Sequence, residues 1–192
     1  DPVEKIAAVG GARHPSIPLP IDLFGDRKNS SGIDLSDRDV LAKTAASVAA
    51  MPPLAAEKVD VAAAITRAHA AFPGWSATPV DERAAILERL ADSLETNRDE
   101  LMAICVQEAF KTIPDAIGEV REAADFCRYY AQQARSGLKS IELPGPTGER
   151  NTLHLDGRGV WATIAPWNFP LAIFLGQTAA ALVAGNAVVA KP

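Results

Sequence analysis

The segment 159–192, GVWATIAPWNFPLAIFLGQTAAALVAGNAVVAKP, constrains the fold of this chain more than any other part of its sequence. Residues 160–165 form a short apolar run that is typical of a buried strand, and residues 187–190 form a second one. Between them, Pro170 opens an apolar helical stretch, and Gly185 fits the left-handed position that follows a helix. We therefore predict a β-α-β unit, which belongs to the α/β class of folds.

The same unit predicts where a ligand would bind. Its strands are parallel, so both carboxyl ends lie at one edge of the sheet, where α/β folds bind their ligands. Asn168 follows the first strand and Lys191 ends the second, so we expect both to face one crevice. The glycine-rich phosphate loop of ordinary dinucleotide-binding folds is missing, and PWNFP, residues 166–170, stands in its place. This stiff turn could aim the Asn168 amide at a developing oxyanion, or the amide could bond local backbone.

Residues 51–137 show helical periodicity throughout. The pattern changes at residue 57, and the first helix after it is expected to stop at Pro73, which Gly74 follows. The second begins with a cap-like Thr78 and with Pro79 at its first helical position. The expected buried faces are Val61, Ile65, Ala68 and Phe72 in the first helix, and Ile86, Leu90 and Leu94 in the second.

Two further helices are predicted in the same region. Asn97, with Glu100 three residues later, is expected to begin one of them, and the other covers about residues 114–134. Cys105 and Cys127 fall on the apolar faces of these two helices, and neither has a histidine nearby in the sequence to act as its base. We interpret both as core residues of a reduced protein and expect a cytoplasmic location.

The ends of this helical region differ from it in composition. Residues 1–50 are predicted to form an extended arm or interdomain linker because prolines interrupt them, and only residues 39–50 look helical. The sequence leaves open whether the arm is loose or docks on a neighbouring domain. Residues 138–158 are predicted to form a β-hairpin, with strands at 139–143 and 151–155. Because an isolated hairpin is marginal, we expect it to join another sheet, with oligomerisation as one role.

Composition excludes several classes of protein. The 192 residues are 48% apolar and 22% charged, which describes a globular chain with a core. The net charge is −5 and the cations are scattered, so we expect no nucleic-acid partner. Polar residues interrupt the apolar run 171–190, so we predict no transmembrane segment. No metal site is expected, since none of the histidines has a ligand partner at suitable spacing: His14, His69 and His154.

A family resemblance adds to these inferences. The string PWNFP, followed by an alanine-rich helix and GN-x-V-V-x-KP, closely resembles the aldehyde dehydrogenase superfamily, and this combination is highly specific. Residues 108–111, EAFK, occupy the place of the family's more usual E-x-G-K, with Phe110 in place of glycine. Three finer strings resemble the L-glutamate γ-semialdehyde dehydrogenase module of the bifunctional proline utilization A (PutA) flavoproteins, over essentially the whole chain: IPLPIDLFGDRKNSSGIDLSD, REAADFCRYYAQQARSGL and PLAIFLGQ.

The resemblance implies oxidation of L-glutamate γ-semialdehyde to L-glutamate with NAD⁺, through a thiohemiacetal and a thioester on a cysteine. Asn168 would be the oxyanion donor, and Lys191 would contact the adenosine ribose. The nicotinamide ribose would lie along Ile164, Ala165, Pro166 and Trp167.

The resemblance also implies what lies around this chain. The nucleophilic cysteine and the general-base glutamate would come after Pro192, so the fragment alone is expected to be inactive and residues 159–192 to begin an unfinished Rossmann-like sheet. An FAD-dependent proline dehydrogenase domain would precede it in the same polypeptide, and the whole is expected to be a homo-oligomer that acts on a small aldehyde.

Two alternatives remain open on the sequence. The first is an aldehyde dehydrogenase with a different substrate range, because the cofactor half is shared across the superfamily. The second is a non-catalytic assembly segment, in which the arm and the hairpin make subunit contacts and the Asn168 turn is inert. A downstream cysteine in a glycine-flanked loop would favour the enzyme.

Overall fold

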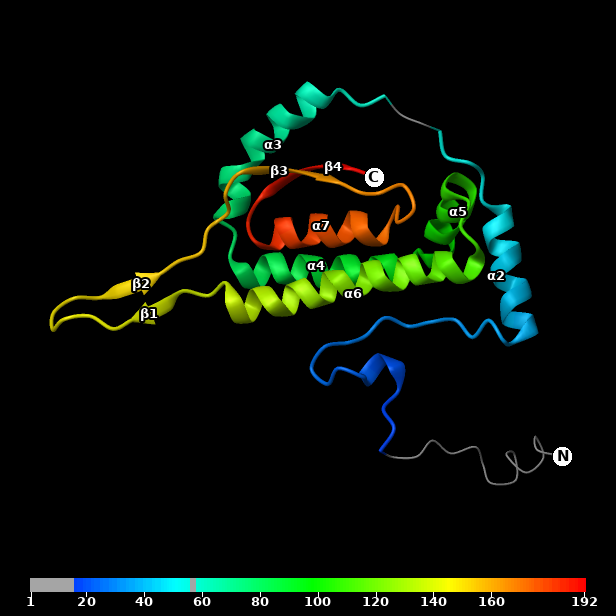
Figure 1. Cartoon of the computed structure of the whole chain (residues 1–192), viewed down its shortest axis with the longest axis horizontal. Coiled ribbons are helices and arrows are strands. Elements are labelled where there is room, and N and C mark those ends of the chain that lie inside the picture. Colours follow the sequence, from blue (N-terminus) through cyan, green and yellow to red (C-terminus); the bar gives the residue numbers. More distant parts are fainter. Residues whose placement is uncertain (1–15, 56–57) are drawn as a thin grey trace.

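The computed structural model describes residues 16–55 and 58–192 of the chain. Its centre is an antiparallel pair of helices, α4 (Val80–Thr96) and α6 (Ile113–Gly137), and α7 (Ala172–Val183) packs on both (Figure 1). Helix α5 (Arg98–Ala109) joins α4 to α6, and α2 (Arg38–Ala50) packs on α5. The predicted helical region and the α/β class are therefore confirmed.

Small side chains let the three central helices approach closely. Most of the fully buried residues between them are alanines, and Leu87, Leu175 and Val183 fill the remaining space. Gly176 of α7 lies where a Cβ atom would come within 3.0 Å of the Phe126 ring of α6. Any larger residue at this position would require the Phe126 ring or α7 to shift. The buried alanines are Ala84, Ala91, Ala123, Ala124, Ala131, Ala134 and Ala179.

The predicted β-α-β unit is confirmed. Strands β3 (Val160–Ile164) and β4 (Ala187–Lys191) are parallel, in a register that pairs the first residues of both strands and the last residues of both, and α7 is their crossover. Gly185 has the expected positive φ, 89°, at the turn after α7. The Asn186 side-chain oxygen accepts hydrogen bonds from the backbone amides of Arg158, at 2.6 Å, and Gly159, at 3.2 Å. Asn186 thus fixes the start of β3 against the start of β4.

The predicted hairpin is also confirmed, with shorter strands. Strand β1 (Ile141–Leu143) pairs antiparallel with β2 (Asn151–Leu153), and the hairpin projects away from the helices (Figure 1). Within the described part of the chain it joins no other sheet, and its residues are largely exposed. The apolar side chains at Ile141, Leu143 and Leu153 therefore face solvent in this chain.

The predicted stop at Pro73 is wrong, because α3 (Val61–Ser76) continues through it. Proline removes one backbone donor and its ring crowds the carbonyl four residues before it, so a helix continues through proline only where other contacts hold the next turn. The last turn is held from outside, since the Trp75 indole nitrogen donates to the Leu182 carbonyl at 2.8 Å. Arg83 adds a further link, because its guanidinium donates to the Ser76 carbonyl at 3.2 Å.

Two predicted helix caps are wrong as well. The Thr78 hydroxyl donates to the Gly74 carbonyl at 3.1 Å, and Pro79 is the residue that precedes α4. Asn97 precedes α5 as predicted, but its side-chain amide donates to the Ser93 carbonyl at 2.8 Å and caps no amide of α5. Both side chains close the preceding helix, because its last carbonyls are also unpaired and lie within reach.

The predicted buried faces are partly wrong. Val61 and Ile65 of α3 are exposed, because α3 lies outside the three-helix core and contacts mainly β3 and β4. In α4, Leu94 is buried as expected, but Ile86 faces outward and Leu87 takes its place in the core. Helix α4 touches both α6 and α7, so its buried face is rotated toward the line between them.

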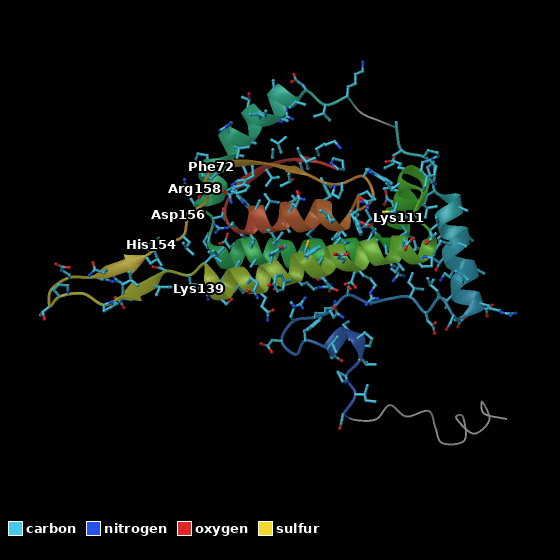
Figure 2. All side chains as sticks on the ribbon, in the orientation of Figure 1. Phe72, Lys111, Lys139, His154, Asp156 and Arg158 are labelled. Atoms are coloured by element: carbon cyan, nitrogen blue, oxygen red, sulfur yellow. The ribbon has the colours of Figure 1, made fainter. Side chains whose placement is uncertain are left out.

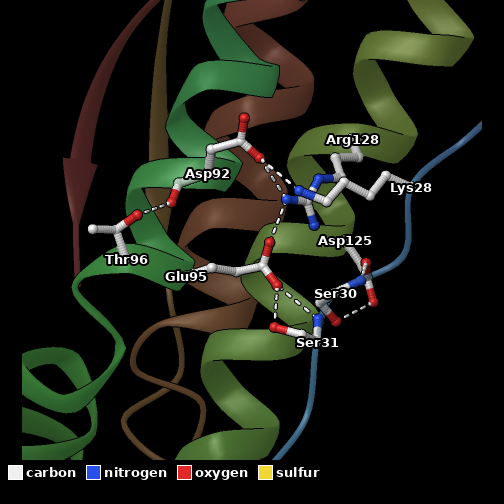
Figure 3. A network of polar contacts seen from close by, with 8 residues as sticks. All are labelled: Lys28, Ser30, Ser31, Asp92, Glu95, Thr96, Asp125 and Arg128. Atoms are coloured by element: carbon white, nitrogen blue, oxygen red, sulfur yellow. Dashed lines mark hydrogen bonds and ion pairs between the residues drawn. The ribbon is translucent and has the colours of Figure 1, made fainter. Parts of the chain in front are cut away.

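The arm docks on the helical core over its described part. After the short 3-10 helix η1 (Pro20–Asp22), the backbone amide and hydroxyl of Ser30 donate to Asp125 of α6, at 2.7 and 2.8 Å. Ser31 donates in the same way to Glu95 of α4, at 2.6 and 2.9 Å (Figure 3). The docked alternative is thus the one observed, whereas Pro15 and the rest of residues 1–15 lie outside the described residues.

Candidate functional site

The loop between β3 and α7 carries Asn168 at its tip. At its start, the Ala165 amide donates to the Lys191 carbonyl at 3.0 Å and extends the parallel ladder past Ile164. Near its end, the Phe169 amide donates to the Pro166 carbonyl at 3.1 Å. This bond closes a turn over the two residues between them, so that their side chains project from the edge of the sheet.

Asn168 is exposed, and within residues 16–55 and 58–192 no group forms a hydrogen bond with its side chain. The neighbouring Trp167 is 82% exposed. The alternative was that the Asn168 side chain bonds the local backbone, and the described structure contains no such hydrogen bond. What the loop offers at its tip is one amide donor beside one large apolar ring.

The loop ends on a buried carboxylate. Helix α7 begins at Ala172, two residues after the predicted start at Pro170. Proline has no amide hydrogen, and the next two amides, of Leu171 and Ala172, donate to Glu119 Oε2 at 3.1 and 2.8 Å. Glu119 belongs to α6 and is 3% exposed. The cap of α7 therefore comes from another helix, because no side chain at its own beginning caps it.

Lys111 completes this contact. Its ammonium lies 3.0 Å from Glu119 Oε1 and 4.7 Å from the centre of the Phe169 ring. The residue before it, Phe110, has φ 54° and ends α5 in the left-handed conformation that glycine adopts most easily. The place where the family more usually has glycine is thus the sharp corner between α5 and α6, and Figure 2 shows Lys111 at that corner.

The remaining predicted cofactor residues lie along the same edge. Ile164 is exposed and pairs with Lys191 at the carboxyl ends of the two strands. Ala165 is buried, so only its backbone can face a ligand there. The Lys191 ammonium donates to the Pro192 carbonyl at 2.8 Å. The structure thus brings together at one edge the residues Ile164, Ala165, Pro166, Trp167, Asn168 and Lys191.

The interpretation of both cysteines as core residues is confirmed. Cys105 and Cys127 are free and buried. Burial raises the pKa of Cys105 to about 11, with a further contribution from Glu119, and raises the pKa of Cys127 to about 12. A thiol attacks as its thiolate, so neither is suited to nucleophilic chemistry near neutral pH.

A separate cleft lies between α3 and β4. Its volume is about 500 Å³, and it is lined mainly by apolar residues together with Arg67, and by none of the predicted site residues. The edge at Asn168 has an amide donor and the Lys191 cation at the carboxyl ends of parallel strands, which is where α/β folds bind their ligands. In the described part of the chain, no cluster of three or more His, Cys, Asp or Glu side chains could hold a metal ion, and no helix is long and apolar enough to cross a membrane.

Sequence reasoning missed Glu119 and the role of Lys111 as its partner. The EAFK segment was a signal for Lys111, but nothing near Glu119 in the sequence marks it as a cap for residues 52 and 53 positions away. Only a helix packed against the loop can bring them together.

Comparison with known proteins identifies the class first. The profile of the aldehyde dehydrogenase family matches residues 35–192, and the chain belongs to this family. The bifunctional protein PutA of Klebsiella aerogenes is 42% identical over 99% of this chain, which spans 16% of that protein. A solved structure of a Bradyrhizobium japonicum PutA mutant is 50% identical, with a TM-score of 0.86. The match covers 100% of this chain and 20% of the chain in that structure. A 1-pyrroline-5-carboxylate dehydrogenase of Anoxybacillus flavithermus is 42% identical over 67% of this chain and 25% of that protein.

Proposed function

We propose that this chain is part of an NAD-dependent dehydrogenase that oxidises L-glutamate γ-semialdehyde to L-glutamate in proline catabolism. One observation carries the chemical part of the proposal. The Asn168 amide is exposed and has no hydrogen-bond partner in the described structure, while the loop behind it is tied down at both ends. Support for the substrate comes from the PutA and 1-pyrroline-5-carboxylate dehydrogenase relatives.

In this proposal Asn168 stabilises negative charge on the substrate oxygen. Attack of a thiolate on an aldehyde moves charge onto the carbonyl oxygen, and a neutral amide can donate to that oxygen without protonating it. A donor already fixed in place need not reorganise during the reaction, which is why a rigid loop suits this role. Both thiols of this chain are buried and their pKa values are raised, so we assign the attacking thiolate to neither of them.

The residues at the strand edge fit the cofactor that the family uses. Ile164 and Trp167 offer exposed apolar surface, and Lys191 offers a cationic donor suited to ribose hydroxyls. When bound there, NAD⁺ would supply the hydride acceptor. This chain's residues would hold and orient it, with Ile164, Ala165, Pro166 and Trp167 along the nicotinamide ribose and Lys191 at the adenosine ribose.

The bifunctional PutA relatives support two wider parts of the proposal. An FAD-dependent proline dehydrogenase domain would belong to the same polypeptide and would supply the precursor of the aldehyde. The exposed apolar residues of the β1–β2 hairpin would pack on another subunit of a homo-oligomer. Both parts concern the whole protein, of which this chain would form only one segment.

A substrate panel tests the proposal. The protein, at the full length of its bifunctional relatives, is assayed for NAD⁺ reduction with L-glutamate γ-semialdehyde and with shorter and aromatic aldehydes. We expect the highest kcat/KM for L-glutamate γ-semialdehyde. A higher value for another aldehyde would instead support a dehydrogenase of different substrate range, and absence of turnover with every aldehyde would support the assembly segment.

A further inference from the structure

We propose that Glu119 and Lys111 are positioning residues for Asn168: together they hold the loop so that its amide points at the reacting oxygen. This inference rests on the proposed function, because it needs Asn168 to act on the substrate. It adds two residues, on α6 and at the end of α5, that lie apart from the PWNFP segment in the sequence.

The loop is held on both sides of Asn168. On its amino side, the Ala165 amide is bonded into the strand ladder through the Lys191 carbonyl. On its carboxyl side, Glu119 accepts from two successive amides at the start of α7. If the carboxyl-side contacts were lost, the loop would keep one anchor and the position of Asn168 would be set by the strand alone.

Lys111 extends the contact to the residue next to Asn168. Its ammonium lies over the Phe169 ring at 4.7 Å, which is within the range of a cation–π interaction. The same ammonium pairs with Glu119 at 3.0 Å. One charge pair therefore touches both the backbone that follows the loop and the side chain that adjoins Asn168.

The pairing has a physical reason. A carboxylate at a helix N-terminus is favoured, because it satisfies unpaired amides and faces the positive end of the helix dipole. A carboxylate as buried as Glu119 also needs a counterion, and Lys111, whose side chain is 17% exposed, supplies it. Neither residue can be removed without leaving the other charge buried and unpaired.

The first test compares Glu119→Ala with a matched control. Glu95→Ala also removes a carboxylate that pairs with a cation and accepts a backbone amide, but it anchors the arm, on the opposite side of the α4 and α6 pair from the Asn168 loop (Figure 1). In the full-length enzyme, Glu119→Ala is expected to lower kcat about 10- to 100-fold. Glu95→Ala is expected to lower Tm and to leave kcat unchanged, and equal effects of both variants on kcat would overturn the proposal.

The second test asks whether Glu119 acts through Asn168. In an Asn168→Ala background, Glu119→Ala should lower kcat no further, because the group it positions is already gone. A second, multiplicative loss would mean that Glu119 acts by another route, and the inference would be wrong. If Asn168→Ala alone kept full kcat, the proposed function of Asn168 would fail first, so the two failures are distinguishable.

Lys111→Met covers the case in which Glu119→Ala does not fold. It leaves the bonds from Glu119 to the two amides and removes the ammonium over Phe169. We expect kcat to fall about tenfold and Lys111→Arg, which restores a cation, to recover most of it. Unchanged kcat in Lys111→Met, or a loss that Lys111→Arg leaves unrepaired, would overturn the proposal.

Discussion

Two segments far apart in the sequence are fastened to the central helices by the same kind of contact. The arm gives the amides of Ser30 and Ser31 to carboxylates on α6 and α4. The Asn168 loop gives the amides of Leu171 and Ala172 to Glu119 on α6. In each case a buried or partly buried cation pairs with an accepting carboxylate: Arg128 with Glu95 and Lys111 with Glu119.

The difference lies in what each contact leaves exposed. In the arm, Ser30 is itself buried and Ser31 is exposed, and both serine hydroxyls add further bonds to the same carboxylates that accept their backbone amides (Figure 3). In the loop, the hydrogen bonds lie on either side of the tip, and Trp167 and Asn168 at the tip remain exposed. The arm contact anchors a segment to the helical core, whereas the loop contacts restrain a segment and leave its tip free to bind another molecule.

The largest effect that would separate the two regions is expected from Asn168→Ala. Loss of one oxyanion donor costs about 3 to 4 kcal/mol in the transition state, so kcat should fall by about two to three orders of magnitude. The exposed Asn168 side chain makes no hydrogen bond with the described residues, so the free energy of unfolding should change by less than about 0.5 kcal/mol. The kcat, the NAD⁺ dissociation constant and Tm of the full-length variant check this. A destabilised variant with normal turnover would make the loop a structural element like the arm.

At the arm contact, Arg128→Met should lower stability and leave turnover unchanged, which is the reverse of the effect expected from Asn168→Ala. Arg128 is buried, and it donates to Glu95 and, at 2.8 Å, to Asp92. Its removal leaves Glu95 without its cation, and we expect unfolding free energy to fall by about 3 kcal/mol with kcat preserved. Denaturant unfolding measures the first quantity and steady-state kinetics the second. Lys28→Met is the matched control, because Lys28 also pairs with Asp92 but is half exposed, and it should cost far less.

A smaller effect is expected at the corner that carries Lys111. Phe110 is 88% exposed and holds a left-handed conformation, which costs a residue with a Cβ atom about 1 to 2 kcal/mol. Phe110→Gly should raise unfolding free energy by about 0.5 to 1 kcal/mol after the entropy of glycine in the unfolded chain is counted. Phe110→Ala keeps the strained backbone and should bring no gain. Thermal unfolding of both variants measures the difference. Equal stability of the two would show that the left-handed backbone of Phe110 does not destabilise the protein.

The smallest effect is a pH dependence of the arm contact. Burial alone would raise the pKa of Glu95, but the hydrogen bonds from Ser31 and Arg128 outweigh it and hold this pKa below its ordinary value of 4.5. A lowered pKa in the folded state stabilises the protein above pH 4.5 and ceases to do so as the pH falls through the folded value. The stability difference between the natural protein and Glu95→Gln should therefore shrink below about pH 4.5. A difference independent of pH between 3 and 7 would contradict this.

The sequence predicted the elements whose signals are local. The β-α-β unit, the hairpin and the helices with strong periodicity are confirmed, because apolar spacing, turn residues and a C-terminal glycine act within a few positions of one another. Burial of both cysteines followed from the same spacing. The stop at Pro73 and the side-chain caps at Thr78 and Asn97 were wrong, although α5 does begin after Asn97, because contacts with other helices or with the preceding turn decided these ends.

By itself, then, the sequence determined that the chain forms helices followed by a parallel β-α-β unit, with Asn168 after its first strand and Lys191 at the end of its second. Only the tertiary structure decided that Glu119 caps α7 from 53 positions away and that Ser30 docks on Asp125, 95 positions away. The reason is that a hydrogen bond between distant segments depends on how helices pack, and packing sums weak contacts over the whole core. No single stretch of residues encodes that sum, so the side chains that hold the loop in place become visible only once the helices are assembled.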